Sequence, residues 1–222
     1  MADLTLMDIN SIVEAENASV RSISGDENHA PLSADEIRAI NNRIAEIAEN
    51  PDVFGVLWKA RKAIYRAVAA VKKENPKPFE GFTAEGDAYD LILLRPQDIK
   101  RDGTALTTFT TDVTAVGVAD YESDTGGAAI SLDKYEGRVY CGWADPVDVP
   151  KAVGVEIQRN NNDRFIIPTL FSLCKDYPII QHTPVIIKPY DSYKITVRYA
   201  ATGTDRLMPV GVRIVPAKVL SL

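Results

Sequence analysis

The spacing of apolar residues changes once along this chain, and the change limits the folds that it can adopt. Between Ser33 and Asn75 apolar side chains recur every three or four residues, as in amphipathic helices. After Tyr89 they occur in short β-branched runs separated by Gly, Pro, Asn and Asp, which is typical of antiparallel strands. A parallel sheet is disfavoured because no crossover helices separate the strands. The sequence therefore predicts an α+β fold, with an N-terminal helical hairpin followed by an antiparallel β-sandwich or jelly-roll-like barrel.

Charge divides the 222 residues in the same way. Residues 1–50 hold three Lys/Arg and ten Asp/Glu, whereas residues 51–82 hold seven and three. We expect a flexible acidic arm over residues 1–32, a helical hairpin with a basic second helix over residues 33–82, and a β domain over residues 83–222. These parts differ enough in charge to attract different partners.

The acidic arm begins with a short apolar segment. The segment is made of Leu4, Leu6, Met7, Ile9, Ile12 and Val13. It could dock on its own domain or reach a neighbouring subunit, and the spacing favours neither. The first residues do not resemble a signal peptide, and no apolar run approaches the roughly 20 residues that cross a bilayer. We expect a protein made in the cytoplasm, without a membrane span.

Two helices are expected after the arm. Ser33 and Glu36 have the spacing of a capping box, and Asn50-Pro51 can end the first helix and begin the second. The first helix has an apolar stripe of Ile37, Ile40, Ile44 and Ile47. The second has a stripe of Val53, Leu57, Ala60, Ile64, Ala67 and Val71. The stripes can pack on each other as a hairpin, or both can lie against the β domain.

Lys59, Lys62, Arg66 and Lys73 fall near one face of the second helix. One interpretation is a solvated face that pairs with acids of the first helix, such as Glu46. The other is non-specific contact with the phosphate backbone of a nucleic acid. We take these four residues as the candidate contact with a nucleic acid or another acidic partner.

About eight strands are expected in the β domain. They are Tyr89–Leu94, Leu106–Val118, Gly137–Trp143, Ala152–Gln158, Phe165–Ile167, Val185–Ile187, Ser192–Tyr199 and Met208–Val215. The stretch from Tyr193 to Tyr199 alternates strictly between apolar and polar residues, as a strand with one buried face requires.

Asp120, Glu122 and Asp124 are the one candidate metal site, because they precede two glycines as in the front of a calcium loop. The glycine is displaced and the bidentate Glu is missing, so an acidic loop is the preferred interpretation. Cys141 and Cys174 are expected to be reduced, buried thiols. No cofactor is expected.

Three classes of function remain open. No nucleophile elbow, P-loop or dinucleotide fingerprint is present, so an enzyme would depend on dispersed acids between Asp120 and Glu156. A carbohydrate-binding or cell-surface-binding module would need Trp143, Tyr190 and Tyr193 exposed in one groove. The third class, a non-enzymatic structural subunit of an assembly, is the leading hypothesis, the binding module is the alternative, and an enzyme is ranked last.

The stretch from Phe165 to Val215 resembles the closing strands of virus or phage coat-type β barrels. The resemblance lies in proline-bounded strands, the Lys188-Pro189-Tyr190 entry and the Gly203-Thr204-Asp205 turn, and no functional residue is carried over from it. It implies a virion structural protein such as a capsid or cement subunit, whose partners are copies of itself, other assembly proteins and non-specifically bound nucleic acid. The arm and helices would then reach neighbouring subunits or the genome.

Overall fold

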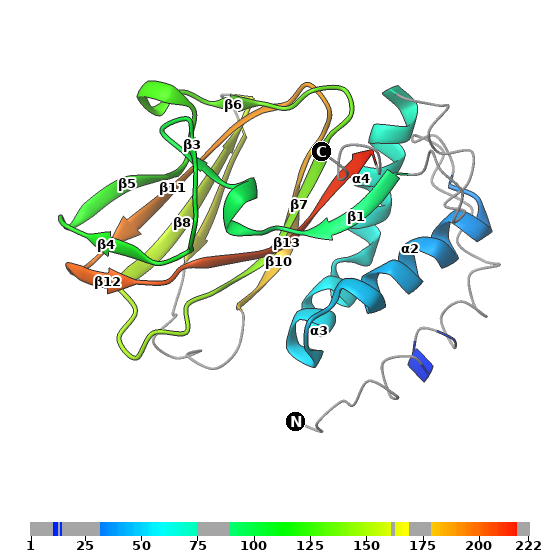
Figure 1. Ribbon diagram of the computed structural model, residues 1–222, viewed down its shortest axis with the longest axis horizontal. Coiled ribbons are helices and arrows are strands. Elements are labelled where there is room, and N and C mark those ends of the chain that lie inside the picture. The colour runs from blue at the N-terminus through cyan, green and yellow to red at the C-terminus, as the bar shows by residue number, and fades with distance from the viewer. Residues whose placement is uncertain are drawn as a thin grey trace.

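The computed structural model describes residues 11, 12, 14, 32–74, 89–160, 163–168 and 179–216. Three layers follow one another in Figure 1: a layer of helices, a four-stranded sheet and a five-stranded sheet. All strand pairings between the named strands are antiparallel. The predicted α+β class, with N-terminal helices followed by an antiparallel sandwich, is confirmed.

Helix α2 (Ala34–Ile47) begins as predicted, because the Ser33 hydroxyl accepts from the Glu36 amide and the Glu36 carboxylate accepts from the Ser33 amide. Asn50 caps α3 (Pro51–Lys59) through its side chain. The predicted second helix is broken at Ala60, and α4 (Arg61–Glu74) continues from there. The break places α3 and α4 separately on the sheet beneath them.

The four-stranded sheet has the order β1-β13-β7-β10. These strands are β1 (Tyr89–Leu93), β13 (Met208–Pro216), β7 (Gly137–Ala144) and β10 (Ile179–Ile187). The five-stranded sheet has the order β5-β11-β8-β9, and β6 also pairs with β11. These strands are β5 (Gly117–Glu122), β11 (Ser192–Tyr199), β8 (Ala152–Arg159), β9 (Asp163–Pro168) and β6 (Ile130–Ser131).

Short strands and 3-10 turns lie in the connections between the main strands. Strand β4 (Thr111–Val113) pairs with β12 (Gly203–Asp205), and β2 (Lys100–Arg101) pairs with β3 (Thr104–Ala105). Two 3-10 turns, η3 (Pro96–Asp98) and η4 (Thr125–Gly127), lie on either side of β5 in the sequence.

The main strands follow the order of a jelly roll. Strand β1 pairs with β13, β5 with β11, β7 with β10 and β8 with β9. The chain therefore forms one long hairpin, with β1, β5, β7 and β8 on one arm and β13, β11, β10 and β9 on the other. Successive pairs fall alternately in the two sheets, which is how a jelly roll is wound.

The four-stranded sheet is buried on both faces. Val139, Cys141 and Val212 pack against Ile44, Leu57, Ile64 and other residues of the helix stripes. On the opposite face, aromatic and aliphatic side chains of the two sheets form a second core. Its largest members are Tyr121, Tyr140, Trp143 and Tyr193. The helices thus lie against the β domain, the second of the two packings that the stripes allow.

Two predicted strands differ from the structure. The strand predicted over Val185–Ile187 begins at Ile179, so the segment 181–184, which was interpreted as a turn, lies within β10. The expected strand Leu106–Val118 is replaced by β4 and by β5, which begins at Gly117 and runs on through Asp120 to Glu122. Gly117 has a φ of +131°, which a glycine adopts readily, and a bulge shifts the pairing with β11 between Asp120 and Glu122. The start of the predicted acidic loop is therefore part of a strand.

Candidate functional site

The outer face of the five-stranded sheet is the candidate interaction surface. Within the described part of the chain, the α-helices cover the four-stranded sheet and no α-helix lies on this face (Figure 1). Its two outer strands each carry an exposed aliphatic side chain: Val118 on β5 is 61% exposed and Ile166 on β9 is 71% exposed. An edge strand that displays apolar side chains is prone to pair with another chain unless something protects it.

Between these edges the face is polar. The cross-strand registers place Thr196 of β11 between Asp120 and Glu156. Lys194 Nζ lies 2.8 Å from Asp120 Oδ1, and Arg164 Nη1 lies 3.6 Å from Glu156 Oε1. Opposite charges therefore neutralise one another across the face.

A pocket of about 250 Å³ opens beside these strands. It is lined by Gly127, Ala129, Gln158, Ser192, Tyr193 and Lys194. The lysine is already engaged, because Nζ donates to the carbonyl oxygen of Gly127 at 2.7 Å as well as pairing with Asp120. The lining offers hydrogen-bonding groups but no carboxylate.

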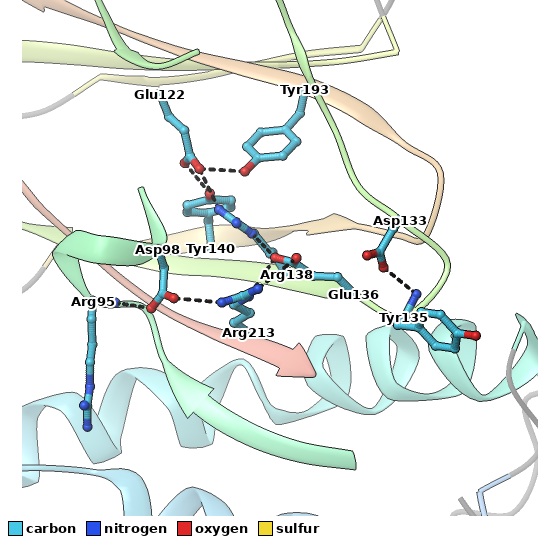
Figure 2. Close-up of polar contacts among 10 residues, drawn as sticks. All are labelled: Arg95, Asp98, Glu122, Asp133, Tyr135, Glu136, Arg138, Tyr140, Tyr193 and Arg213. Atoms are coloured by element: carbon cyan, nitrogen blue, oxygen red, sulfur yellow. Dashed lines mark hydrogen bonds and ion pairs between the residues drawn. The ribbon is translucent and has the colours of Figure 1, made fainter. Parts of the chain in front are cut away.

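A buried ionic network joins the two sheets (Figure 2). The Glu122 carboxylate, at the end of β5, accepts from Arg138 Nη1, Tyr140 Oη and Tyr193 Oη, each at 2.6 Å. Arg138 Nε donates to Glu136 Oε1, also at 2.6 Å. These contacts connect β5, β7 and β11.

The same network continues to β13 and η3. Arg213 donates through Nε and Nη2 to the two oxygens of Glu136, at 2.8 and 3.1 Å, and through Nη1 to Asp98 Oδ1 at 2.9 Å. The other oxygen of Asp98 accepts from the Arg95 amide at 2.9 Å. The two arginines therefore alternate with three carboxylates through the interior.

The environment fixes the charges in this network. Burial raises the pKa of Glu122, and Arg138 and the two phenols only partly oppose that effect. Burial also disfavours the charge on Glu136, but Arg138 and Arg213 outweigh it and lower the pKa of that carboxyl. Burial raises the pKa of Tyr140 and Tyr193 well above the usual range, and nearby Glu122 raises it further. Both phenols therefore stay protonated and act as donors.

This network has the properties of a structural clamp. Its buried side-chain nitrogens and oxygens all have hydrogen-bond partners. Each charged group is directed at another group of the network rather than at an open pocket (Figure 2). A fully satisfied buried network specifies how the layers pack, and it leaves no reactive group free.

The four candidate basic residues lie on the helical layer, with Lys59 at the end of α3 and Lys62, Arg66 and Lys73 on α4. All four are exposed. Lys72, which is not one of the four, pairs with an acid of α2: its Nζ lies 2.6 Å from Glu36 Oε1. Contact of the basic face with a nucleic acid stays a prediction.

Most of the predicted intersubunit arm lies outside the described residues. This applies to Leu4, Leu6, Met7, Ile9 and Val13, whereas Ile12 is half-buried. Its docking on another subunit stays a prediction, as do the boundaries at residues 32 and 82. None of the described helices is long and apolar enough to span a bilayer.

The three carboxylates of the candidate metal site do not come together. Asp120 pairs with Lys194, Glu122 points into the core, and Asp124 accepts from the Thr125 amide. The bulge in β5 turns Glu122 inward beside Tyr121, which separates it from its neighbours. No cluster of three metal-binding side chains occurs among the residues that the structure describes.

The three aromatic residues proposed for sugar binding do not share a groove. Trp143 and Tyr193 are buried in the second core, and only Tyr190 is exposed. Cys141 is a buried free thiol, as expected. Cys174 and the side chain of His182 lie outside the described residues.

Sequence reasoning missed most of the ionic network, although a signal was present. Arg138 and Arg213 each interrupt a strand that is apolar on both faces, and a charge in such a strand must find a buried partner. The partners were not identifiable, because Glu122 was assigned to a loop and Asp98 and Glu136 lie outside the predicted strands.

No protein-family model matches the chain, and the comparison with curated proteins gave no match. Among solved structures, the GH26-CBM35 β-(1,4)-mannanase of Podospora anserina is 11% identical with a TM-score of 0.25, over 57% of this chain and 28% of that one. Dimeric latent PorU from Porphyromonas gingivalis is 10% identical with a TM-score of 0.24, over 61% of this chain and 13% of that one. The chain thus spans less than a third of either protein, and likenesses this distant carry no argument.

Proposed function

We propose that this protein is a non-enzymatic structural subunit of a larger assembly, which it joins through the outer face and edges of its five-stranded sheet. The observation that carries the proposal is the asymmetry of the sandwich. One sheet is closed off by α2, α3 and α4, whereas the other exposes Val118 and Ile166 on its two outer strands. Apolar side chains on unpaired edges favour association with another chain.

The specific form that we propose is a capsid or cement protein of a virion. The jelly-roll winding supports it, because that architecture recurs in viral capsid domains, although lectins and other proteins share it. The resemblance of residues 165–215 to the closing strands of virus or phage coat-type β barrels also supports this form. In this arrangement the basic face formed by Lys59, Lys62, Arg66 and Lys73 would contact nucleic acid or another acidic partner, and the N-terminal arm would contact neighbouring subunits.

Association is tested by size-exclusion chromatography with light scattering on the full chain, over protein concentrations from micromolar to near millimolar. We expect oligomers or particles, which electron microscopy would then identify as rings, shells or filaments. A strict monomer at the highest concentration, unchanged by deletion of residues 1–30, would refute the proposed role.

The surface is tested by placing a charge on one edge. Ile166→Asp should weaken association at least tenfold, because it puts a carboxylate into the apolar contact. Val149→Asp is the matched control, since Val149 is also exposed, at 65%, but lies in the β7–β8 loop. Equal effects of the two substitutions would remove Ile166 from the interface.

The basic face is tested separately, so that a negative result for nucleic-acid binding does not bear on the proposed contact through the five-stranded sheet. Binding of a fluorescent duplex is measured as a function of salt for the wild type and for a variant with Lys59, Lys62 and Lys73 changed to Glu. Phosphate contacts predict weaker binding and a shallower dependence on salt in the variant. Unchanged binding would exclude this face as a nucleic-acid contact.

A further inference from the structure

Two buried aspartates lie at one end of the sandwich, outside the ionic network. Asp145 directly follows β7 and is 2% exposed, and Asp205 ends β12 and is 1% exposed. Asp205 Oδ1 accepts from the Lys151 amide at 2.9 Å, and Asp145 Oδ1 accepts from the Val147 amide at 3.5 Å. Each carboxyl group therefore has one oxygen held by the β7–β8 loop.

The second oxygens are unsatisfied as long as both groups are ionised. Asp145 Oδ2 and Asp205 Oδ2 are buried, and neither accepts a hydrogen bond from the residues that the structure describes. The pairing of Ala144 with Met208 brings Asp145 and Asp205 together at this end of the sheet, and the charge of Asp205 acts on the Asp145 carboxyl group. Two carboxylates cannot donate to each other, and two adjacent buried negative charges repel. A single proton between them removes the repulsion and supplies the missing donor.

The surroundings offer no cationic partner that would do the same. No Lys, Arg or His forms an ion pair with either aspartate in the described part of the chain. Lys151 and Arg206 of the flanking segments approach the pair through their backbone amides. Tyr199 of β11 interacts with both aspartates and with Arg101 of β2, and burial raises the pKa of Tyr199 to about 12.

We propose that Asp145 and Asp205 share one proton at neutral pH, and that this proton locks the β7–β8 loop to the end of β12. Loss of the proton leaves two adjacent carboxylates in the interior, so the lock loosens as the pH rises. The inference does not depend on the proposed role in an assembly.

The pH at which the pair loses its proton follows from the environment of the two carboxyl groups. Burial, and then the charge of Asp205 and the hydrogen bond with it, raise the pKa of Asp145 to about 7. An unfolded Asp has a pKa of about 3.9, so between these values the folded protein holds a proton that the unfolded chain has lost. Stability must therefore fall as the pH rises through this window and reach its low plateau above pH 7.

The test is urea unfolding of the full chain between pH 5 and pH 9, for the wild type, Asp145→Asn and Asp205→Asn. An amide replaces the shared proton with a permanent donor, so each variant should lose the part of the pH-dependent fall that this pair contributes. That fall approaches tenfold in the folding equilibrium constant per pH unit for one proton. Asp148→Asn, an exposed aspartate of the same loop, is the control and should keep it. An unchanged pH dependence in both variants of the pair would overturn the proposal.

Two further measurements keep the test decisive if a variant fails to fold. The wild type should show the infrared carbonyl band of a protonated carboxyl group at pH 6, and this band should disappear by pH 9. Its absence at pH 6 would overturn the shared proton. Calcium chloride is added at pH 6 with a chelator control. If millimolar calcium raises the stability of the wild type but not of Asp145→Asn at this pH, the pair holds a divalent cation where the proton was proposed, and the proton lock is refuted.

Discussion

Arg138 is the residue whose removal tests the buried ionic network most directly. Its guanidinium lies 2.6 Å from both Glu122 and Glu136, and its side chain is 6% exposed. Replacement by Met keeps a side chain of similar length but removes two charge-assisted hydrogen bonds, worth about 1.5–3 kcal/mol each. Glu122 would keep its two phenol donors and Glu136 would keep Arg213. We expect Arg138→Met to lower the free energy of unfolding by about 3–5 kcal/mol, the usual cost of unpairing a buried charge.

The loss should also depend on pH. Without Arg138, burial of Glu122 is opposed only by the phenols, so the pKa of this carboxyl in the folded protein rises further. A raised pKa in the folded state means that stability falls as the pH rises above the unfolded value of about 4.3. The cost of the substitution should therefore be larger at pH 8 than at pH 5.

Urea unfolding followed by tryptophan fluorescence measures both effects, since Trp143 lies in the core beside Tyr140. Arg38→Met is the matched control, because Arg38 forms an exposed pair with Asp35 that should contribute less than about 1 kcal/mol. If Arg138→Met costs no more than Arg38→Met at pH 8, the network does not clamp the sheets and the argument is refuted.

Three other predictions concern packing and accessibility. Gly211→Ala should lower the free energy of unfolding in urea by about 2–3 kcal/mol, because the new Cβ would lie 2.2 Å from the Val139 carbonyl oxygen. Gly55→Ala has free space in α3 and should raise the free energy of unfolding by about 0.5–1 kcal/mol. Ser33→Ala should cost about 1 kcal/mol through loss of the α2 cap, and an undiminished melting temperature would contradict this. Burial raises the pKa of the Cys141 thiol, so alkylation of this thiol should require unfolding. Peptide mass spectrometry measures the labelling, and rapid labelling of Cys141 in the native protein would contradict the prediction.

The parts of the fold that depend on local signals could be predicted from the sequence. Ser33 with Glu36, and Asn50 with Pro51, set helix boundaries through contacts within one turn, and both are found in the structure. The alternation from Tyr193 to Tyr199 likewise fixed one strand and its buried face. These features were accessible because the residues that determine them are close together in the sequence.

Features that depend on distant partners could not be predicted in the same way. The helical spacing of apolar residues continues through Ala60, so it gives no sign of the break between α3 and α4. We attribute the break to packing of the two helices on the sheet beneath them. Asp205 was interpreted as a turn residue, because nothing in its own segment indicates that Asp145 lies opposite. The candidate interaction surface was also missed, since the exposure of Ile166 depends on β9 being an outer strand.

The position of β13 in the four-stranded sheet has a consequence for how the chain is made. This strand, completed only at Pro216, lies between β1 and β7 and supplies Val210, Val212 and Ile214 to the core under the helices. The helical segments leave the ribosome first, yet the surface that shelters their apolar side is finished last. During synthesis these segments must remain exposed, or be held by a chaperone, until β13 has emerged.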